Sequence, residues 1–178
     1  MGEQLIVRHA VLDDAEGIAR VHTRSWQIAY RGIMSDDYLD ALSWETRFKM
    51  WSSRLSTTQP ASNNLFVATD ADDSVTGFAA IGEVRDEDLA SKRFFELFAI
   101  YVDPEAWAQG IGKALLASAL QSVPGEAPGV SLWVLAGNDR ARRFYQHNGF
   151  EHDGTSKVQS IGGRDLEEVR YLRSRMGG

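Results

Sequence analysis

A glycine-containing stretch near the middle of the chain has the residue types of an anion-binding turn. Gln109-Gly110-Ile111-Gly112-Lys113-Ala114 follows one apolar run and leads directly into a second apolar segment with helical spacing. Glycine lets the backbone approach a ligand closely, and the first N–H groups of a helix together carry about +0.5 of positive charge, which favours phosphate groups. Lys113 adds a mobile cation. The stretch therefore predicts a pyrophosphate-binding turn at the start of a helix.

The glycines also have a steric interpretation, because tight turns use glycine without any ligand. Two common phosphate-binding fingerprints do not match this stretch. Leu115 stands where the dinucleotide-binding motif has its third glycine, and Ala114 follows Lys113 where a Walker P-loop has Ser or Thr. The turn alone therefore leaves the ligand open.

A second segment, residues 132–150, again reads as a strand, a capped helix, a glycine stop and a strand. Together the two segments resemble the GNAT superfamily of acetyltransferases. The acetyl-CoA motif of that family, Gln/Arg-x-x-Gly-x-Gly/Ala, is matched at Gln109, Gly112 and Ala114. The later Asn…Ala…Phe-Tyr…Gly-Phe pattern is matched from Asn138 to Phe150. The resemblance in the order of elements extends over nearly the whole chain.

The resemblance implies that acetyl-CoA is the cosubstrate and that its pantetheine arm lies between the strand ending at Val102 and the strand at 132–135. Asn138 could contact the cofactor or could serve only as a helix cap. Arg142 and Arg143 could reach the phosphates of coenzyme A or could be ordinary solvated surface residues. The residues expected to contact acetyl-CoA are Ile100, Tyr101, Val102, Gln109, Gly110, Ile111, Gly112, Lys113, Ala114, Asn138 and Arg143.

An amine acceptor must lose a proton, because an amine of pKa near 10.4 is neutral in only about one molecule in a thousand at physiological pH. Glu96 lies six residues before Val102, and an even spacing predicts that both face one side of a strand. Glu96 resembles the glutamate that acts as general base in some branches of the family. The alternative is a structural carboxylate paired with a basic neighbour such as Arg93, with Glu83 as the reserve candidate for the base.

Tyr145 matches the position of the family's usual acid, which donates a proton to the departing coenzyme A thiolate. It lies two helical turns after Asn138, so both side chains are expected to face the same groove. The alternative is a core aromatic that packs with Phe144. The resemblance also assigns stabilisation of the developing oxyanion to the backbone amide of Val102.

Aromatic residues in the first helix recur on one stripe. His22, Trp26 and Tyr30 are spaced four residues apart, and Trp26 and Tyr30 are the expected contacts of the acceptor. Together with the aromatic residues of 44–51, the stripe suggests a pocket that accepts cations, because ring faces attract ammonium groups. The alternative is a second core layer between helices and sheet.

The length predicts a single domain over residues 1–178, which the resemblance implies is an N-acetyltransferase domain. We expect an α/β fold whose mixed, mostly antiparallel sheet of six to seven strands is flanked by about four helices. The expected strands are 4–9, 65–69, 75–84, 94–102, 130–135, 150–160 and 164–173. The expected helices are 13–30, 44–55, 110–123 and 138–147, with a capped restart at Ser35 and a loop over 56–64.

Composition narrows the classes of function. The formal net charge of −6 and the lack of a basic cluster argue against nucleic acid, and no apolar run has the length of a membrane span. The chain has no cysteine, which excludes an acyl-cysteine intermediate. The four histidines show no metal-ligand spacing, so no metal is expected. We expect a cytoplasmic protein, and pairing of its C-terminal strands would make a homodimer.

The sequence therefore predicts an N-acetyltransferase that moves an acetyl group from acetyl-CoA to a small amine or a peptide by direct attack in a ternary complex. One alternative is a non-catalytic acyl-CoA sensor or regulatory module that kept the binding turn. Another is acetylation of a protein N-terminus, while the acidic net charge disfavours aminoacyl-tRNA.

Overall fold

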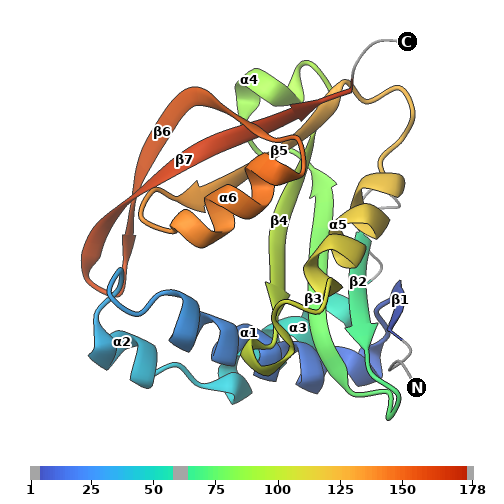
Figure 1. Cartoon of the computed structure of the whole chain (residues 1–178), viewed down its shortest axis with the longest axis vertical. Helices are drawn as coiled ribbons and strands as arrows, with labels where there is room; N and C mark the ends of the chain where they lie inside the picture. Colours follow the sequence, from blue (N-terminus) through green and yellow to red (C-terminus); the bar gives the residue numbers. More distant parts are fainter. Residues whose placement is uncertain (1–4, 58–63, 176–178) are drawn as a thin grey trace.

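A seven-stranded sheet with helices on both faces is built from residues 5–57 and 64–175, the parts of the chain that the computed structural model describes (Figure 1). Its strands, in the order β1-β2-β3-β4-β5-β7-β6 across the sheet, are β1 (Ile6–His9), β2 (Asn64–Thr69), β3 (Val75–Glu83), β4 (Phe95–Val102), β5 (Gly129–Leu135), β6 (Glu151–Ile161) and β7 (Arg164–Ser174). The described helices are α1 (Ala15–Ala29), α2 (Asp36–Asp40), α3 (Trp44–Ser56), α4 (Glu87–Ala90), α5 (Ile111–Gln121) and α6 (Asp139–His147).

All pairs of neighbouring strands are antiparallel except β4 and β5. That parallel pair is short, because its register runs only from Phe95–Val130 to Glu96–Ser131. Beyond this point the two central strands diverge. The predicted fold class, a mixed and mostly antiparallel sheet, is confirmed, and so is the predicted separation of these two strands.

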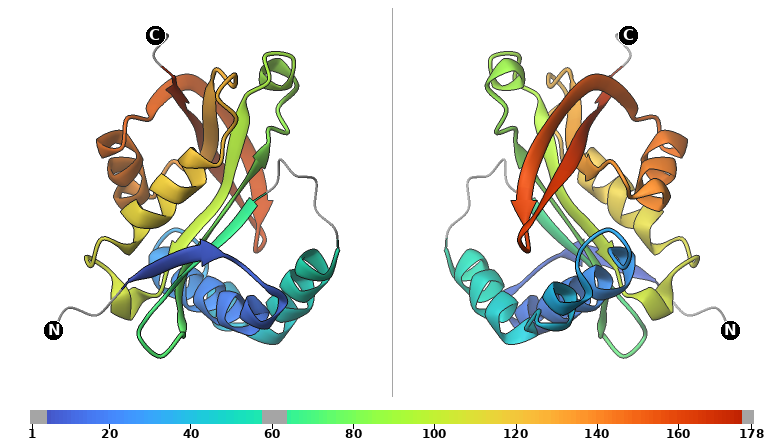
Figure 2. Two further views of the ribbon diagram at one scale, coloured as in Figure 1. Left: turned by 90° about the vertical axis from the view of Figure 1, so that its right-hand side faces the viewer. Right: turned by 90° about the vertical axis from the view of Figure 1, so that its left-hand side faces the viewer.

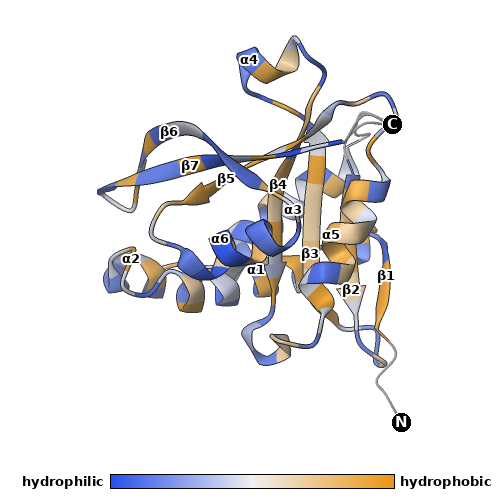
Figure 3. Cartoon of the chain, turned by 45° about the horizontal axis from the view of Figure 1, so that its top comes forward, coloured by the Kyte–Doolittle hydropathy of each residue, from blue (hydrophilic) through white to orange (hydrophobic). Residues whose placement is uncertain are grey.

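The helices form two layers. Figure 2 shows α5 and α6 on one face of the sheet and α1 and α3 on the other. Each layer buries its own hydrophobic cluster: Leu115 and Leu116 of α5 are at most 2% exposed on one face, and Ile18 of α1 and Trp51 of α3 are as deeply buried on the other. The central strands are the most apolar part of the sheet, whereas the β6–β7 hairpin is largely hydrophilic (Figure 3).

Local signals position these elements. The side chains of Ser35, Ser43 and Asn138 accept hydrogen bonds from the first turns of α2, α3 and α6, so the helices begin at N-caps. Gly162 and Gly163 both have positive φ and form the two-residue turn of the final hairpin. The short helix α4 was not predicted, and most of the expected loop at 56–64 lies outside the described residues.

A bulge in β4 overturns one prediction. The register with β3 passes from Ala80–Ala99 directly to Ile81–Leu97, so β4 has one extra residue at Phe98. Leu97 and Val102 therefore both pack on the α5 side, although their odd spacing would place them on opposite faces. Glu96, which alternates with Leu97, points to the opposite side. The expectation that Glu96 and Val102 share one face is wrong, because the bulge shifts the period of two.

None of the helices in the described part of the chain is long and apolar enough to span a membrane.

Candidate active site

A cavity of about 630 Å³ lies where β4 and β5 diverge. Its wall takes in most of β4, the end of β5, one side of α1, the start of α5 and one side of α6. Because the diverging strands stop pairing after Glu96 and Ser131, their facing edges leave backbone groups that no neighbouring strand can bind. The cavity therefore combines apolar and charged side chains with backbone groups that no neighbouring strand binds.

The start of α5 has the geometry of an anion cradle. Gly110 is its N-cap with φ of +81°, a conformation that favours glycine, and no side chain caps the helix. The amide of Ala114 bonds to the carbonyl of Gly110, so the amides of the first three residues have no partner within the helix. These three residues, Ile111, Gly112 and Lys113, all line the cavity.

Gly112 gives a separate test of whether a ligand approaches this turn. Its φ is not positive, and an added Cβ would lie 3.6 Å from Phe144 and 3.7 Å from Val102, which are ordinary contacts. Neither backbone conformation nor packing therefore requires glycine here. A close approach of a ligand to the backbone is the remaining physical reason, and it fits a pyrophosphate on the helix terminus.

The edge of β4 presents the amides expected to meet the pantetheine arm. The amide of Asp103 donates to the Thr76 carbonyl at 2.8 Å, so this residue directs its backbone groups toward β3. Because that direction alternates along a strand, the N–H groups of Val102 and Ile100 point away from β3 into the gap. The Val102 carbonyl already accepts from Ser25 and Trp107, both at 2.9 Å, which leaves its N–H as the available group.

Tyr145 of α6 lies in the cavity wall and is 9% exposed. Its ring packs edge-on against Phe144 and Phe150, so it is also part of the core. Burial raises the pKa of the Tyr145 phenol, which keeps it protonated at neutral pH. The structure places Asn138 in the same wall, as the spacing of the two residues predicted.

Glu96 also lines the cavity, and it is 1% exposed. Arg85 holds its carboxylate through the guanidinium, with Nε at 3.1 Å, and through its own backbone N–H, also at 3.1 Å. The expected neighbour Arg93, which has a positive φ just before β4, instead lies 3.8 Å from Glu126. The reserve candidate Glu83 is exposed and is not part of the wall.

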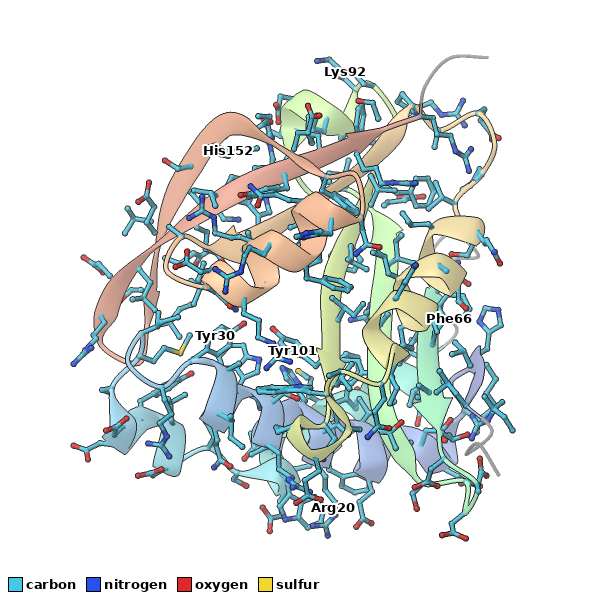
Figure 4. The ribbon with its side chains drawn as sticks, viewed as in Figure 1. Arg20, Tyr30, Phe66, Lys92, Tyr101 and His152 are labelled. Carbon is cyan, nitrogen blue, oxygen red and sulfur yellow. The ribbon has the colours of Figure 1, made fainter. Side chains whose placement is uncertain are left out.

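At the α1 end, aromatic side chains close the cavity. Trp26 and Tyr30 line it, as predicted, and the Tyr30 hydroxyl lies 3.3 Å from that of Tyr101. Figure 4 shows Tyr30 and Tyr101 close together between β4 and α1. Burial raises the pKa of both phenols, so they are protonated and can donate. The result is an apolar chamber with hydroxyl groups at its end.

His22 lies behind this wall rather than in it. Its ring stacks on Tyr101 at 5.2 Å, and its Nδ1 accepts a hydrogen bond from Trp51 at 3.2 Å. Burial, with a contribution from the nearby Arg47 cation, lowers the pKa of His22 to about 3. His22 is therefore a neutral residue of the second core layer, as the alternative interpretation of the aromatic stripe supposed.

The rings that were expected to attract a cationic acceptor already hold cations of the protein. Each of the five tryptophans of the sequence has a Lys or Arg side chain 3.5 to 5.4 Å from its ring centroid. The pairs are Trp26 with Arg47, Trp44 with Arg20, Trp51 with Arg54, Trp107 with Arg140, and Trp133 with Lys157. None of the aromatic residues of 44–51 lines the cavity.

The cavity brings together most of the residues expected from the sequence, except Gln109, Ala114 and Arg143, which lie outside its wall. Sequence reasoning missed several wall residues from β6, η2 (Pro104–Ala106), α6 and the sheet. The β6 residues recur with the period of two that marks one face of a strand, a signal that could have identified them. The missed residues include Lys157, Gln159, Ile161, Trp107, Trp133, Arg140 and Glu168.

Within residues 5–57 and 64–175, no group of three or more His, Asp or Glu side chains has the arrangement of a metal site.

Comparisons with known proteins agree with this geometry. Residues 23–150 match the model of the acetyltransferase (GNAT) family. The uncharacterized N-acetyltransferase YuaI of Bacillus subtilis is 34% identical, with 95% of this chain and 98% of the relative covered. The spermidine N(1)-acetyltransferase of Thermoplasma acidophilum is 28% identical over 93% of this chain and 96% of its own. The structure is also similar to the crystal structure of PaiA N-acetyltransferase from Thermoplasma acidophilum in complex with coenzyme A, with a TM-score of 0.68 between the two. That comparison covers 97% of this chain and 99% of the other, at 24% sequence identity. The chain belongs to the acetyltransferase (GNAT) family.

Proposed function

We propose that the protein transfers the acetyl group of acetyl-CoA directly to a primary amine while both substrates occupy the cavity between β4 and β5. The observation that carries this proposal is the continuity of the cavity. One wall holds the uncapped turn at Gly110–Lys113, and the same cavity reaches the aromatic chamber at Trp26 and Tyr30. A single cavity therefore joins an anion cradle to an aromatic end at which an acceptor could bind.

In this proposal, the amides of residues 111–113 and the side chain of Lys113 bind the pyrophosphate, and the β4 edge holds the pantetheine arm. Acetyl-CoA supplies an activated thioester. The N–H of Val102 is the donor aimed into the gap, and it stabilises negative charge that develops on the thioester oxygen. Fixing the amine and the thioester side by side supplies much of the rate enhancement in a reaction of this kind.

Glu96 is the proposed acceptor of the amine's proton, through an intervening water. It is the carboxylate of the wall that lies on β4, on the face opposite Val102. Its ion pair with Arg85 fixes the position of the carboxylate in the cavity wall. Replacing Glu96 with Gln should lower turnover most near neutral pH, with partial recovery as alkaline pH deprotonates the free amine. Activity unchanged over the whole pH range would remove Glu96 from the mechanism.

Tyr145 is the proposed donor to the departing coenzyme A thiolate. Burial keeps its phenol protonated, and the residue lies in the same wall as Asn138 and the start of α5. A general acid needs a proton at the working pH and a position near the departing sulfur, and the burial of Tyr145 in the cavity wall supports both.

The test is release of free coenzyme A thiol from acetyl-CoA in the presence of polyamines, amino acids, aminoglycosides and short peptides. The relative from Thermoplasma acidophilum acts on spermidine, so polyamines are an obvious first acceptor. We expect at least one acceptor to give thiol release that falls strongly in Tyr145→Phe, a variant that retains the ring. Saturable acetyl-CoA binding without thiol release for any acceptor would favour a non-catalytic acyl-CoA sensor instead.

A further inference from the structure

Two buried hydrogen-bond donors beside the acceptor chamber have no acceptor. Nη1 of Arg47 and Nε1 of Trp26 have almost no solvent-exposed surface and no acceptor in good hydrogen-bond geometry in the described part of the chain, although the Trp26 indole lies close enough to the Tyr101 hydroxyl to oppose the rise in the pKa of that phenol. The two groups are neighbours, since the Arg47 guanidinium lies 4.6 Å from the centroid of the Trp26 ring. Buried donors are almost always satisfied in folded proteins, so two adjacent exceptions indicate an acceptor that arrives with a ligand.

Arg47 differs in this respect from the other arginines that hold parts of the fold together. Arg8 bonds to Asp14, Arg85 to Glu96, and Arg170 to Asp88 and Asp153. Burial lowers the pKa of Arg47, and no carboxylate is among the groups that oppose this effect. Arg47 is thus a partly buried cation with no anion beside it among the described residues.

The position of Arg47 assigns it to the acceptor end of the cavity. It lies in α3, on the face of the sheet opposite α5, whose first turn is the anion cradle (Figure 2). Its neighbours Trp26, Tyr30 and Tyr101 form the wall of the acceptor chamber. Arg47 itself lies just behind this wall. Because no ion pair holds its guanidinium, the side chain can turn toward the chamber without breaking one.

The charged side chains of the cavity wall also favour an acceptor that carries a negative group. Four cations line the cavity, Arg85, Lys113, Arg140 and Lys157, against the two carboxylates Glu96 and Glu168. Each carboxylate already has a basic partner, since Glu96 bonds to Arg85 and Glu168 lies 3.6 Å from Lys157. A polyamine needs carboxylates for the ammonium groups that do not react, and this wall offers it none that is unpaired.

We propose that the acceptor is a primary amine that also carries a carboxylate, as an amino acid does, and that Arg47 together with Trp26 binds this carboxylate. The guanidinium supplies the charge and the fork geometry that carboxylates favour, and the indole N–H supplies a further donor. The inference names a substrate class for the site and rests on the proposed acetyl transfer.

The test compares amines that differ only in this charge. Thiol release is measured with the proteinogenic amino acids, their carboxamides and spermidine, for the wild type, Arg47→Met and Arg47→Lys. Methionine keeps an unbranched apolar stem on Trp26 but removes the charge. Arg20→Met is the matched control, because Arg20 covers Trp44 in the same way, at 3.8 Å, outside the cavity wall. Converting the carboxylate to a carboxamide also changes the basicity of the amine. The quantity compared between the protein variants is therefore the ratio of kcat/KM for the amino acid to kcat/KM for its carboxamide, because the basicity effect is the same for every variant.

We expect the wild type to favour an amino acid over its carboxamide, with a ratio about 10-fold to 100-fold higher than in Arg47→Met, through KM rather than kcat. Arg47→Lys should retain part of this preference, and Arg20→Met all of it. Acetylation of spermidine in preference to every amino acid, or an equal ratio in wild type and Arg47→Met, would overturn the inference while leaving the proposed transferase intact.

A second readout does not require turnover. Removing a partly buried cation that has no anionic partner should raise the thermal midpoint of the ligand-free protein by about 2–4 °C in Arg47→Met, whereas a structural role would lower it. With coenzyme A bound, amino acids should raise the midpoint of the wild type but not of Arg47→Met. If no acceptor is acetylated, a rise in the thermal midpoint with amino acids in the wild type alone would still support the carboxylate site, although the proposed transfer would have failed. A lower midpoint in Arg47→Met without any amino-acid effect would reject the site.

Discussion

The ion pair between Glu96 and Arg85 predicts that the more exposed partner is the more costly one to remove. The Glu96 side chain is 1% exposed and that of Arg85 is 69% exposed. Replacing Glu96 with Gln leaves an arginine that water can solvate and an amide that still accepts from the Arg85 backbone. Replacing Arg85 with Met leaves a charged carboxylate in the interior, with only the backbone N–H that lies 3.1 Å away as a partner.

Leaving a buried charge without its partner lowers folding stability by about 3–5 kcal/mol, whereas losing an ordinary hydrogen bond lowers it by about 1 kcal/mol. We therefore expect Arg85→Met to lower the free energy of unfolding by about 3 kcal/mol, and Glu96→Gln by about 1 kcal/mol, at pH 7.5 in urea titrations. Arg164→Met, at an exposed arginine of the final hairpin, is the control and should change stability little. A Glu96→Gln variant as unstable as Arg85→Met would refute this reasoning, because the cost would then not follow the buried charge.

Three further predictions concern other parts of the site. The pKa of His22 is lowered to about 3, so below pH 6.5 the unfolded chain binds a proton that the folded protein does not. The free energy of unfolding should then fall by about 1.4 kcal/mol per pH unit from pH 6.5 toward 4. His22→Asn should remove this pH dependence. The control His152→Asn, at an exposed histidine, should retain it. Tyr145→Phe should fold normally and lower kcat by about 100-fold, with acetyl-CoA binding by calorimetry nearly unchanged; wild-type kcat would exclude Tyr145 as the acid. Gly112→Ala should leave stability the same or higher by up to about 1 kcal/mol, because alanine favours helix, and weaken acetyl-CoA binding at least about 10-fold. Unchanged affinity in Gly112→Ala would mean that no ligand approaches this turn closely.

The order of the strands and of the longer helices could be predicted from the sequence, because the periodicity of apolar residues and the helix caps are local features. Ser35 and Asn138 cap their helices as expected, and Gly162-Gly163 forms the final turn. The glycine turn and the resemblance to a family together located one end of the cavity. The acetyltransferase family and the mixed sheet are thus both confirmed.

What the sequence could not provide depends on tertiary structure. The bulge at Phe98 moves Glu96 to the face opposite Val102, and nothing in the local pattern marks it. The partner of Glu96 is Arg85, from the loop after the neighbouring strand, rather than Arg93, which is nearer in sequence. The buried Nη1 of Arg47, which has no acceptor, could be identified only from the surrounding structure, because an arginine in an amphipathic helix normally reaches solvent.

Several expectations stay predictions. They are the single domain over residues 1–178, the cytoplasmic location, the homodimer, the absence of a nucleic-acid partner and of a metal, the contacts of all the named residues with acetyl-CoA and with the acceptor, and the catalytic roles of Glu96 and Tyr145.

The central claim is that an acetyl group passes from acetyl-CoA to the nitrogen of a primary amine. The most direct measurement supplies isotopically labelled acetyl-CoA with the acceptor panel and follows both the labelled amine by mass spectrometry and the released thiol. We predict an N-acetylated product formed in equal amount to the thiol, with both signals falling together in Tyr145→Phe. Saturable acetyl-CoA binding with neither labelled product nor thiol release, for every acceptor in the panel, would contradict the account.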